Sequence, residues 1–138
     1  MNQISFSSQF STGVLSSPNH PGYYQNNLDK TETIQVESGK LLKLEFTHFA
    51  VVGHPSFCET ADYVKIVDWD GTILMDKSCG YSLYDPSSSN YFLPPIITTR
   101  SNRVKIFFHT DFAHTSTGWS LSWSAVTPGV KTTLLTLF

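Results

Sequence analysis

The sequence predicts an all-β protein, an antiparallel sandwich or barrel, and three observations predict it. Several segments alternate apolar and polar residues with a period of two. Turn-forming pairs such as Asp70-Gly71 and Ser101-Asn102 separate these segments. No segment shows a helical period of useful length. One apolar and one polar face per strand, joined by short connections, is typical of antiparallel sheets packed on a core.

The alternation predicts six strands, which are residues 31–36, 41–49, 63–68, 71–76, 103–110 and 119–126. The last segment has the clearest pattern, because serine alternates with an apolar face formed by Trp119, Leu121, Trp123 and Ala125. We therefore expect this apolar face to lie in the core, and the serines to point to the solvent.

The chain has 138 residues, which is the size of one domain. We expect a single domain over residues 1–126 and a tail or linker over residues 127–138, because the alternation ends near Pro128-Gly129. Residues 81–95 are rich in Ser, Tyr and Pro and form a long irregular loop. Loops of that length are uncommon unless they are functional or mobile.

Composition excludes several classes of function. The formal net charge is −2 and the sequence has no basic stripe, so no nucleic-acid partner is expected. No window approaches 18 apolar residues, so no membrane span is expected. The chain begins without the charged and apolar regions of a signal peptide. It also lacks a Gly-x-Ser-x-Gly elbow and a Gly-rich phosphate loop, and we expect no catalytic residues.

The two cysteines, Cys58 and Cys79, are too few for a disulfide framework or for a structural zinc site. Considered alone, the two cysteines leave two interpretations open. They are either two buried free thiols or the single disulfide of a secreted domain.

Five motifs follow one another in the order and spacing of a CUB domain: TGVLSSPNHPGYYQNN, TIQVESGKLLKLEFTHF, CETADYVKIVDWDG, SCG and FFHTDFAHTSTGWSLSW. The resemblance covers residues 10–126 and implies an extracellular, non-catalytic β-sandwich of the jelly-roll type. Within the family, the chain is similar to the first CUB module of the complement-initiating serine proteases. That module also lacks an earlier cysteine pair, and Lys30 stands here at the place of one of those cysteines.

The resemblance implies that Cys58 and Cys79 form a disulfide at one end of the sandwich. It also implies a calcium site at that end, for which Asp62 and Asp111 match two acidic ligands and Tyr24 matches a supporting tyrosine. The third acidic position is Val52, which offers no side-chain oxygen.

Calcium needs six to eight oxygen ligands, so the valine predicts a weakened site, and we expect no tightly bound cofactor. Glu59 and the carbonyl groups near Ala113 and His114 are the remaining oxygen sources. Without a cation, two neighbouring carboxylates repel each other, and the pKa of one of them rises.

The expected function is that of a secreted or extracellular module that binds a protein partner through its end loops. The acidic end would then receive a lysine or another basic side chain of the partner. Aromatic loop residues give large contact area at small entropy cost, and the binding-loop candidates are Tyr81, Tyr84, Tyr91, Phe112 and His114. The alternative is a carbohydrate- or lipid-binding module similar to the spermadhesins, which are single CUB domains.

Overall fold

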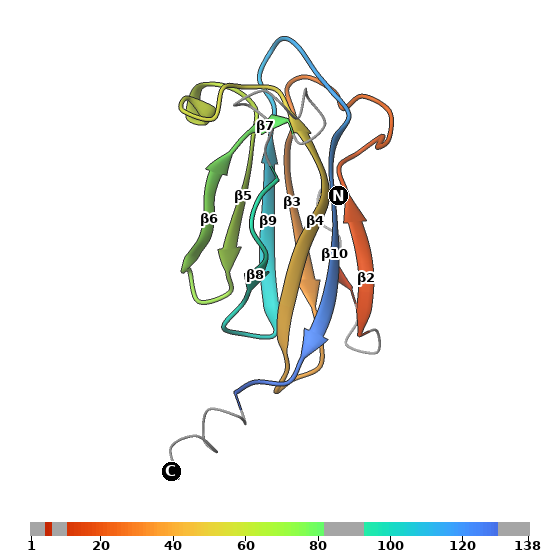
Figure 1. Ribbon diagram of the computed structural model, residues 1–138, viewed down its shortest axis with the longest axis vertical. Coiled ribbons are helices and arrows are strands. Elements are labelled where there is room, and N and C mark those ends of the chain that lie inside the picture. Colours follow the sequence, from red (N-terminus) through yellow and green to blue (C-terminus); the bar gives the residue numbers. More distant parts are fainter. Residues whose placement is uncertain (1–4, 7–10, 82–92, 130–138) are drawn as a thin grey trace.

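Two stacked β-sheets form the protein in the computed structural model, which describes residues 5–6, 11–81 and 93–129 (Figure 1). The first sheet contains, in spatial order, β1 (Ser5–Phe6), β3 (Asp29–Gln35), β9 (Arg103–His109), β5 (Tyr63–Asp68) and β6 (Ile73–Ser78). The second sheet contains β2 (Thr12–Ser16), β10 (Gly118–Val126), β4 (Leu41–Val51) and β7 (Gly80–Tyr81), with β8 (Ile97–Thr98) also paired to β4. Neighbouring strands are antiparallel, except that β1 runs parallel to β3. The predicted antiparallel sandwich is confirmed.

The six predicted strands are present as β3, β4, β5, β6, β9 and β10. The sequence pattern did not predict β1, β2, β7 and β8, because each is short or lies at an edge of a sheet. In β2 the alternation is weak, since Val14 is 64% exposed although it is apolar, and its neighbour Leu15 is buried. A single buried residue on a five-residue strand gives too little pattern to detect.

The core lies between the sheets, and the predicted apolar face of β10 forms part of it. Trp119, Leu121 and Trp123 are all buried. The ring of Trp119 meets Phe46 from its own sheet at a centroid distance of 6.2 Å and Phe108 from the other sheet at 6.0 Å, both edge to face. Edge-to-face pairs of this kind contribute about 0.5–1.5 kcal/mol each beyond their buried area. This aromatic cluster therefore joins the two sheets.

Trp123 also depends on a glycine in the neighbouring edge strand. A Cβ atom at Gly13 would lie 2.5 Å from the Trp123 ring, so any larger residue there would displace the indole. Glycine in the interior of a strand often marks such a close approach.

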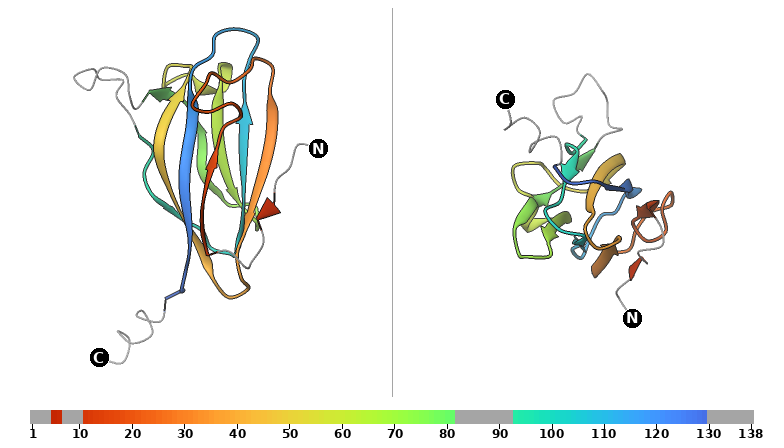
Figure 2. Two further views of the ribbon diagram at one scale, coloured as in Figure 1. Left: turned by 90° about the vertical axis from the view of Figure 1, so that its right-hand side faces the viewer. Right: turned by 90° about the horizontal axis from the view of Figure 1, so that it is seen from below.

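The sandwich has two different ends (Figure 1, Figure 2). We call the end formed by residues 17–28, 52–62 and 110–117 the loop end. The opposite end is formed by residues 36–40, 69–72 and 99–102, and we call it the turn end. Among the described residues, no helix is long and apolar enough to cross a membrane.

Candidate functional site

Asp62 lies at the loop end, immediately before β5, and its side chain is 0% exposed. The Tyr24 hydroxyl donates a hydrogen bond of 2.6 Å to Asp62 Oδ2. The backbone N–H of Asp111 donates one of 2.7 Å to Asp62 Oδ1. Both carboxylate oxygens are therefore held by the protein, and the contacts join three separate loops.

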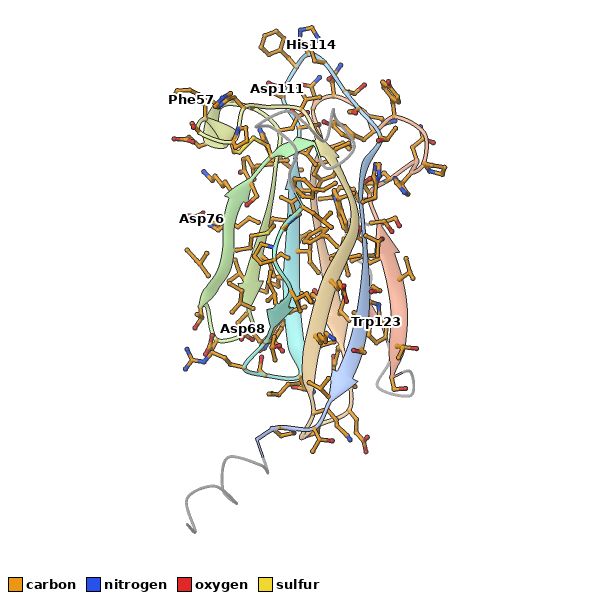
Figure 3. All side chains as sticks on the ribbon, in the orientation of Figure 1. Phe57, Asp68, Asp76, Asp111, His114 and Trp123 are labelled. Atoms are coloured by element: carbon orange, nitrogen blue, oxygen red, sulfur yellow. A yellow bond between two sulfur atoms is a disulfide. The ribbon has the colours of Figure 1, made fainter. Side chains whose placement is uncertain are left out.

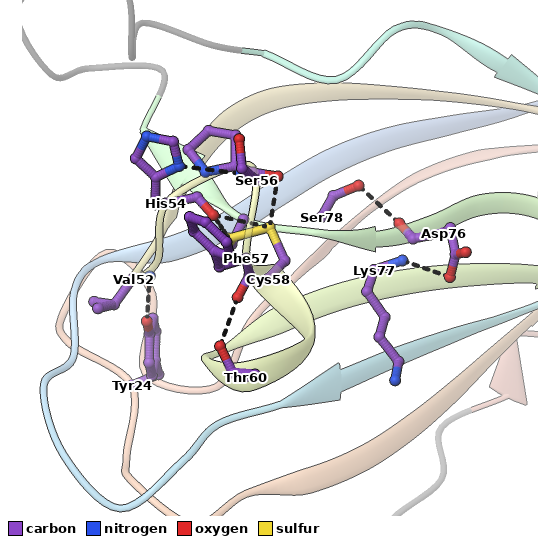
Figure 4. The surroundings of a disulfide bond; sticks show 12 residues. Tyr24, Val52, His54, Ser56, Phe57, Cys58, Thr60, Asp76, Lys77 and Ser78 are labelled. Carbon is purple, nitrogen blue, oxygen red and sulfur yellow. Dashed lines mark hydrogen bonds between the residues drawn. A yellow bond between two sulfur atoms is a disulfide. The ribbon is translucent and has the colours of Figure 1, made fainter.

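Tyr24 completes the connection between these loops. It is 2% exposed, and its ring packs edge to face on Phe108 with a centroid distance of 5.0 Å. Its hydroxyl oxygen accepts a hydrogen bond of 2.9 Å from the backbone N–H of Val52 (Figure 4). Tyr24, Val52, Asp62 and Asp111 thus form one hydrogen-bonded group, in which Val52 takes part through its backbone.

The charges of this group are unfavourably close. Burial raises the pKa of Asp62, the hydrogen bonds from Tyr24 and from the Asp111 backbone oppose that rise, and the negative charge of Asp111 adds to it. The direction agrees with the sequence-based expectation of two repelling carboxylates. Burial, however, is the larger cause of the shift, and repulsion is the smaller one.

The acidic side chains that meet in this group are those of Asp62 and Asp111. Among the described residues, no group of three or more His, Cys, Asp or Glu side chains is placed to hold a metal ion. Asp111 directs one carboxylate oxygen to the backbone N–H of Ala113 at 3.2 Å. Glu59 is exposed on the short 3₁₀ helix Cys58–Thr60 and completes no such group. Val52 adds no oxygen from its side chain, so this group offers a calcium ion two carboxylates and not three.

A disulfide fixes one of the loops of this end. Cys58 and Cys79 are bonded, with their Cα atoms 5.5 Å apart and 21 positions apart in sequence. Closing a loop of that length stabilises the fold by about 3 kcal/mol in the chain-entropy model. Gly53 makes room for the bridge, because a Cβ atom there would lie 2.6 Å from Cys79 Sγ. Residues 53–58 are therefore held close to the end of β6.

Exposed aromatic side chains come from the same three loops as the buried group. Phe112 is 81% exposed, Phe57 is 62% exposed and Tyr23 is 60% exposed, and each comes from a different loop of this end. His114 is also exposed, and its φ of 71° places its backbone in the left-handed region. Figure 3 shows Phe57, Asp111 and His114 together at the loop end.

The predicted binding-loop residues are only partly described. Phe112 and His114 are at the loop end, as stated above. Tyr81 belongs to β7, but its side chain lies outside the described residues, and so do Tyr84 and Tyr91 entirely. The sequence analysis did not select Phe57, although an apolar residue in a polar loop next to a cysteine was a usable signal.

The sequence analysis also missed Asp68, a second buried aspartate, which lies at the turn end and is 1% exposed. It accepts hydrogen bonds from the backbone N–H of Trp69 and of Arg100, at 2.8 and 2.6 Å, and from the hydroxyl of Ser101. The Asp-x-Asp-Gly pattern of residues 68–71 indicated a turn but did not distinguish its buried aspartate from the exposed Asp70.

Comparison with known proteins identifies one family. A family model for the CUB domain matches residues 5–123. Cubilin from Rattus norvegicus is 33% identical over 116 residues, which are 84% of this chain and 3% of cubilin. Mannan-binding lectin serine protease 1 from Homo sapiens is 32% identical over 115 residues, 83% of this chain and 15% of the protease. The chain therefore spans a small part of the length of both relatives.

A solved structure gives the same result. The crystal structure of the MASP-1 CUB2 domain bound to Ca²⁺ has a TM-score of 0.66 and 26% identity, and the match covers 89% of this chain and 96% of that chain. The similar regions are CUB domains and not protease domains, and CUB domains are non-catalytic modules. Cubilin and the serine protease are secreted or extracellular proteins.

Proposed function

Because the chain belongs to the CUB domain family, we propose that it is a secreted or extracellular recognition module whose loop end binds a protein partner. The observation that carries this proposal is the presence of three exposed aromatic side chains from the same three loops as one buried acidic group. We further propose that the domain extends over residues 1–126, followed by a tail or linker over residues 127–138. The family match over residues 5–123 and the end of β10 at Val126 support these boundaries.

The exposed aromatic residues are suited to anchor a partner. Leaving Phe112 81% exposed forgoes the free energy that its burial would provide. Aromatic side chains are enriched at the few interface positions that contribute most of the binding energy. The disulfide and the hydrogen bond of the Tyr24 hydroxyl hold the loop end in place. Few backbone or side-chain conformations would therefore have to be ordered on binding.

Asp111 is the group at this end best placed to meet a basic side chain. Its carboxylate is only half-buried, whereas that of Asp62 is enclosed and already accepts two hydrogen bonds. A lysine ammonium group of the partner would form a charge-assisted hydrogen bond with Asp111 and offset its repulsion of Asp62. Asp62 would then act mainly by accepting the hydrogen bond from the backbone N–H of Asp111, which positions Asp111.

We propose that calcium binds this end only weakly. The related MASP-1 CUB2 domain was crystallised bound to Ca²⁺, which favours some residual affinity. Two carboxylates without a third give fewer ligands and less negative charge, and these are the quantities that set calcium affinity. Partner binding at the loop end would accordingly not depend on millimolar calcium.

The test is capture of proteins from extracellular matrix extract or plasma by the immobilised chain, compared between two variants. Phe112→Ser removes the most exposed aromatic group of the loop end. Ile73→Ser removes an apolar side chain that is 52% exposed near the turn end, and it serves as the matched control. We expect Phe112→Ser to lose a captured protein that the wild type and Ile73→Ser retain. A captured protein that is lost only with Ile73→Ser, or that both variants retain fully, would contradict the proposal.

A further inference from the structure

The outer surface of the first sheet carries a group of positive charges far from the exposed aromatic residues of the loop end. In β9 the residues alternate between buried and half-buried, so Arg103 and Lys105 point away from the core. Lys65 of β5 is paired with Phe107 of β9 and shares that outer side. Lys77 of β6 lies over the outward-pointing ring of Tyr63. We call Lys65, Lys77, Arg103 and Lys105 the cationic face.

Aromatic rings hold three of these four cations. The guanidinium carbon of Arg103 lies 4.7 Å from the centre of the Trp69 ring, and Lys105 Nζ lies 4.9 Å from it. Lys77 Nζ lies 5.0 Å from the centre of the Tyr63 ring. A cation–π contact positions a charged side chain but, unlike a carboxylate, leaves its full positive charge.

No carboxylate of the described residues forms a salt bridge with these four cations. Among the described residues, the contact between a basic and an acidic side chain joins His109 Nδ1 and Asp29 Oδ1 at 2.7 Å, and it involves none of the four cations. Asp76, beside Lys77 on the edge strand, accepts a hydrogen bond from the backbone N–H of Lys77 instead of pairing with its ammonium group (Figure 4). Asp68 is buried and accepts its hydrogen bonds from the turn end.

The outer surface of the second sheet is different, so the concentration of positive charge on the first sheet is not a general property of this chain. There β10 presents Ser122 and Ser124, which are half-buried, and the buried Ser120 is hydrogen-bonded to Ser16 of β2 at 2.8 Å. The charged residues exposed on the adjoining strand β4 are of opposite sign and two positions apart, Lys43 and Glu45. Positive charge is therefore concentrated on one of the two faces.

We propose that the cationic face binds a sulfated polysaccharide. Within the described part of the chain no carboxylate pairs with these four cations, and rings hold three of them in place. They therefore form a preorganised anion site, and preorganisation lowers the entropy cost of binding. The charges are spread over three strands, which lie about 4.8 Å apart in a sheet, and are not gathered around one deep pocket. A long ligand with sulfate groups repeated along its length suits this arrangement. The pocket beside Lys65 is also lined by Lys30, Tyr63 and Phe107, and by Asp29, whose carboxylate contacts His109 at 2.7 Å. One sulfate group would bind there at Lys65, on the side away from Asp29.

The cationic face would give a carbohydrate ligand a location that is independent of protein binding at the loop end.

The test uses heparin as the probe and the full chain, with affinity measured by calorimetry at several NaCl concentrations. Lys65→Gln/Lys105→Gln removes two charges from the cationic face. Lys40→Gln/Lys43→Gln removes two charges elsewhere, from the turn end and from the outer surface of the second sheet, and gives the same net charge.

We expect the first pair to weaken heparin binding by about tenfold and to lower the slope of log Kd against log salt by about two, one for each lost contact. The control pair and Phe112→Ser should bind heparin as the wild type does. Trp69→Leu, which leaves the charge unchanged, should weaken binding by about threefold, because Arg103 and Lys105 lose their ring contact.

Competition experiments decide the chemical class of the ligand. Desulfated heparin, polyglutamate and vesicles containing anionic lipid should compete poorly with intact heparin. Equal competition by polyglutamate would favour an acidic protein segment, and equal competition by the vesicles would favour a membrane surface. Either result, an equal loss with the two charge pairs, or a loss with Phe112→Ser would overturn the proposal.

Discussion

Asp62 and Asp68 lie at the two ends of β5, and both are almost completely buried. Asp68, at the turn end, receives three hydrogen bonds, from two backbone N–H groups and one hydroxyl. Asp62, at the loop end, receives two, from a tyrosine hydroxyl and a backbone N–H. Burial raises the pKa of Asp62, and the negative charge of Asp111, the residue that donates that last bond, adds to the rise.

The comparison separates a structural anchor from a candidate binding site. Asp68 ties the turn at residues 68–71 to residues 100–101, and its three donors fully account for its burial. Asp62 also ties loops together, but its carboxylate adds to a negative charge that the fold does not neutralise. Such a charge beside exposed aromatic groups is what the proposed partner of the loop end would offset.

The largest expected effect is at the structural anchor. Asp68→Ala leaves the N–H groups of Trp69 and Arg100 and the hydroxyl of Ser101 without their acceptor. We expect the free energy of unfolding to fall by about 3–5 kcal/mol, as measured by urea denaturation. Asp70→Ala in the same turn is the control, because Asp70 is exposed and its carboxylate accepts a hydrogen bond from the backbone N–H of Thr72. A loss under about 1 kcal/mol for Asp68→Ala would mean that the turn end does not depend on this carboxylate.

A smaller effect is expected at the loop end. Asp62→Ala also removes an acceptor from two donors, Tyr24 and the Asp111 backbone. It relieves the repulsion between two carboxylates at the same time, so the net loss in the free energy of unfolding should be about 1–2 kcal/mol. If Asp62→Ala costs as much as Asp68→Ala, the distinction between the two ends is wrong.

The pH dependence of stability should show the same contrast. The ordinary pKa of an aspartate is 3.8, and that of Asp62 is raised in the folded state. Between pH 3.8 and the raised pKa of Asp62, the folded state binds more protons than the unfolded state. The free energy of unfolding therefore falls as the pH rises through that window, and then levels off. The variant Asp62→Asn cannot titrate and should lack this component of the fall.

Glu32 requires a control in that experiment, because burial also raises its pKa, with Lys30 opposing the rise. Denaturation between pH 3.5 and pH 7 should therefore include Glu32→Gln, which should remove a separate part of the slope. A wild type that gains stability relative to Asp62→Asn as the pH rises from 3.8 would contradict the raised pKa.

The sequence was sufficient to predict the parts of the fold that depend on periodicity. The six long strands and the buried face of Trp119, Leu121 and Trp123 follow from alternation alone, because a buried sheet face requires it. The four short strands do not, since two to five residues carry almost no pattern. Their positions depend on the neighbours that they pair with, which are distant in sequence.

The candidate site could be predicted only in outline. The resemblance to the CUB family pointed to Tyr24, Asp62 and Asp111, but not to the fact that Asp62 directs both oxygens into the protein. Asp68 and Asp70 stand two residues apart in one turn, and local sequence does not distinguish the buried one from the exposed one. That difference arises from residues 100 and 101, about thirty positions away. The cationic face was missed for a similar reason, because its members come from three strands.

The smallest expected effect concerns calcium. We propose that the loop end retains two carboxylates but lacks the third oxygen donor that tight calcium binding needs, and a calcium titration tests this directly. Ligand stabilisation grows as RT ln(1 + [L]/Kd), so millimolar calcium should stabilise the wild type by well under about 1 kcal/mol. Val52→Glu supplies the missing carboxylate and should gain calcium-dependent stability, whereas Val52→Gln, similar in size but uncharged, should gain much less.

The decisive measurement is calorimetric unfolding of the wild type and these two variants, each in calcium and in chelator. We expect a calcium-dependent rise in the melting temperature for Val52→Glu and almost none for the wild type. Strong calcium stabilisation of the wild type, lost on Asp111→Ala, would contradict this expectation. That result would mean that Glu59, backbone carbonyls or water complete the shell despite Val52.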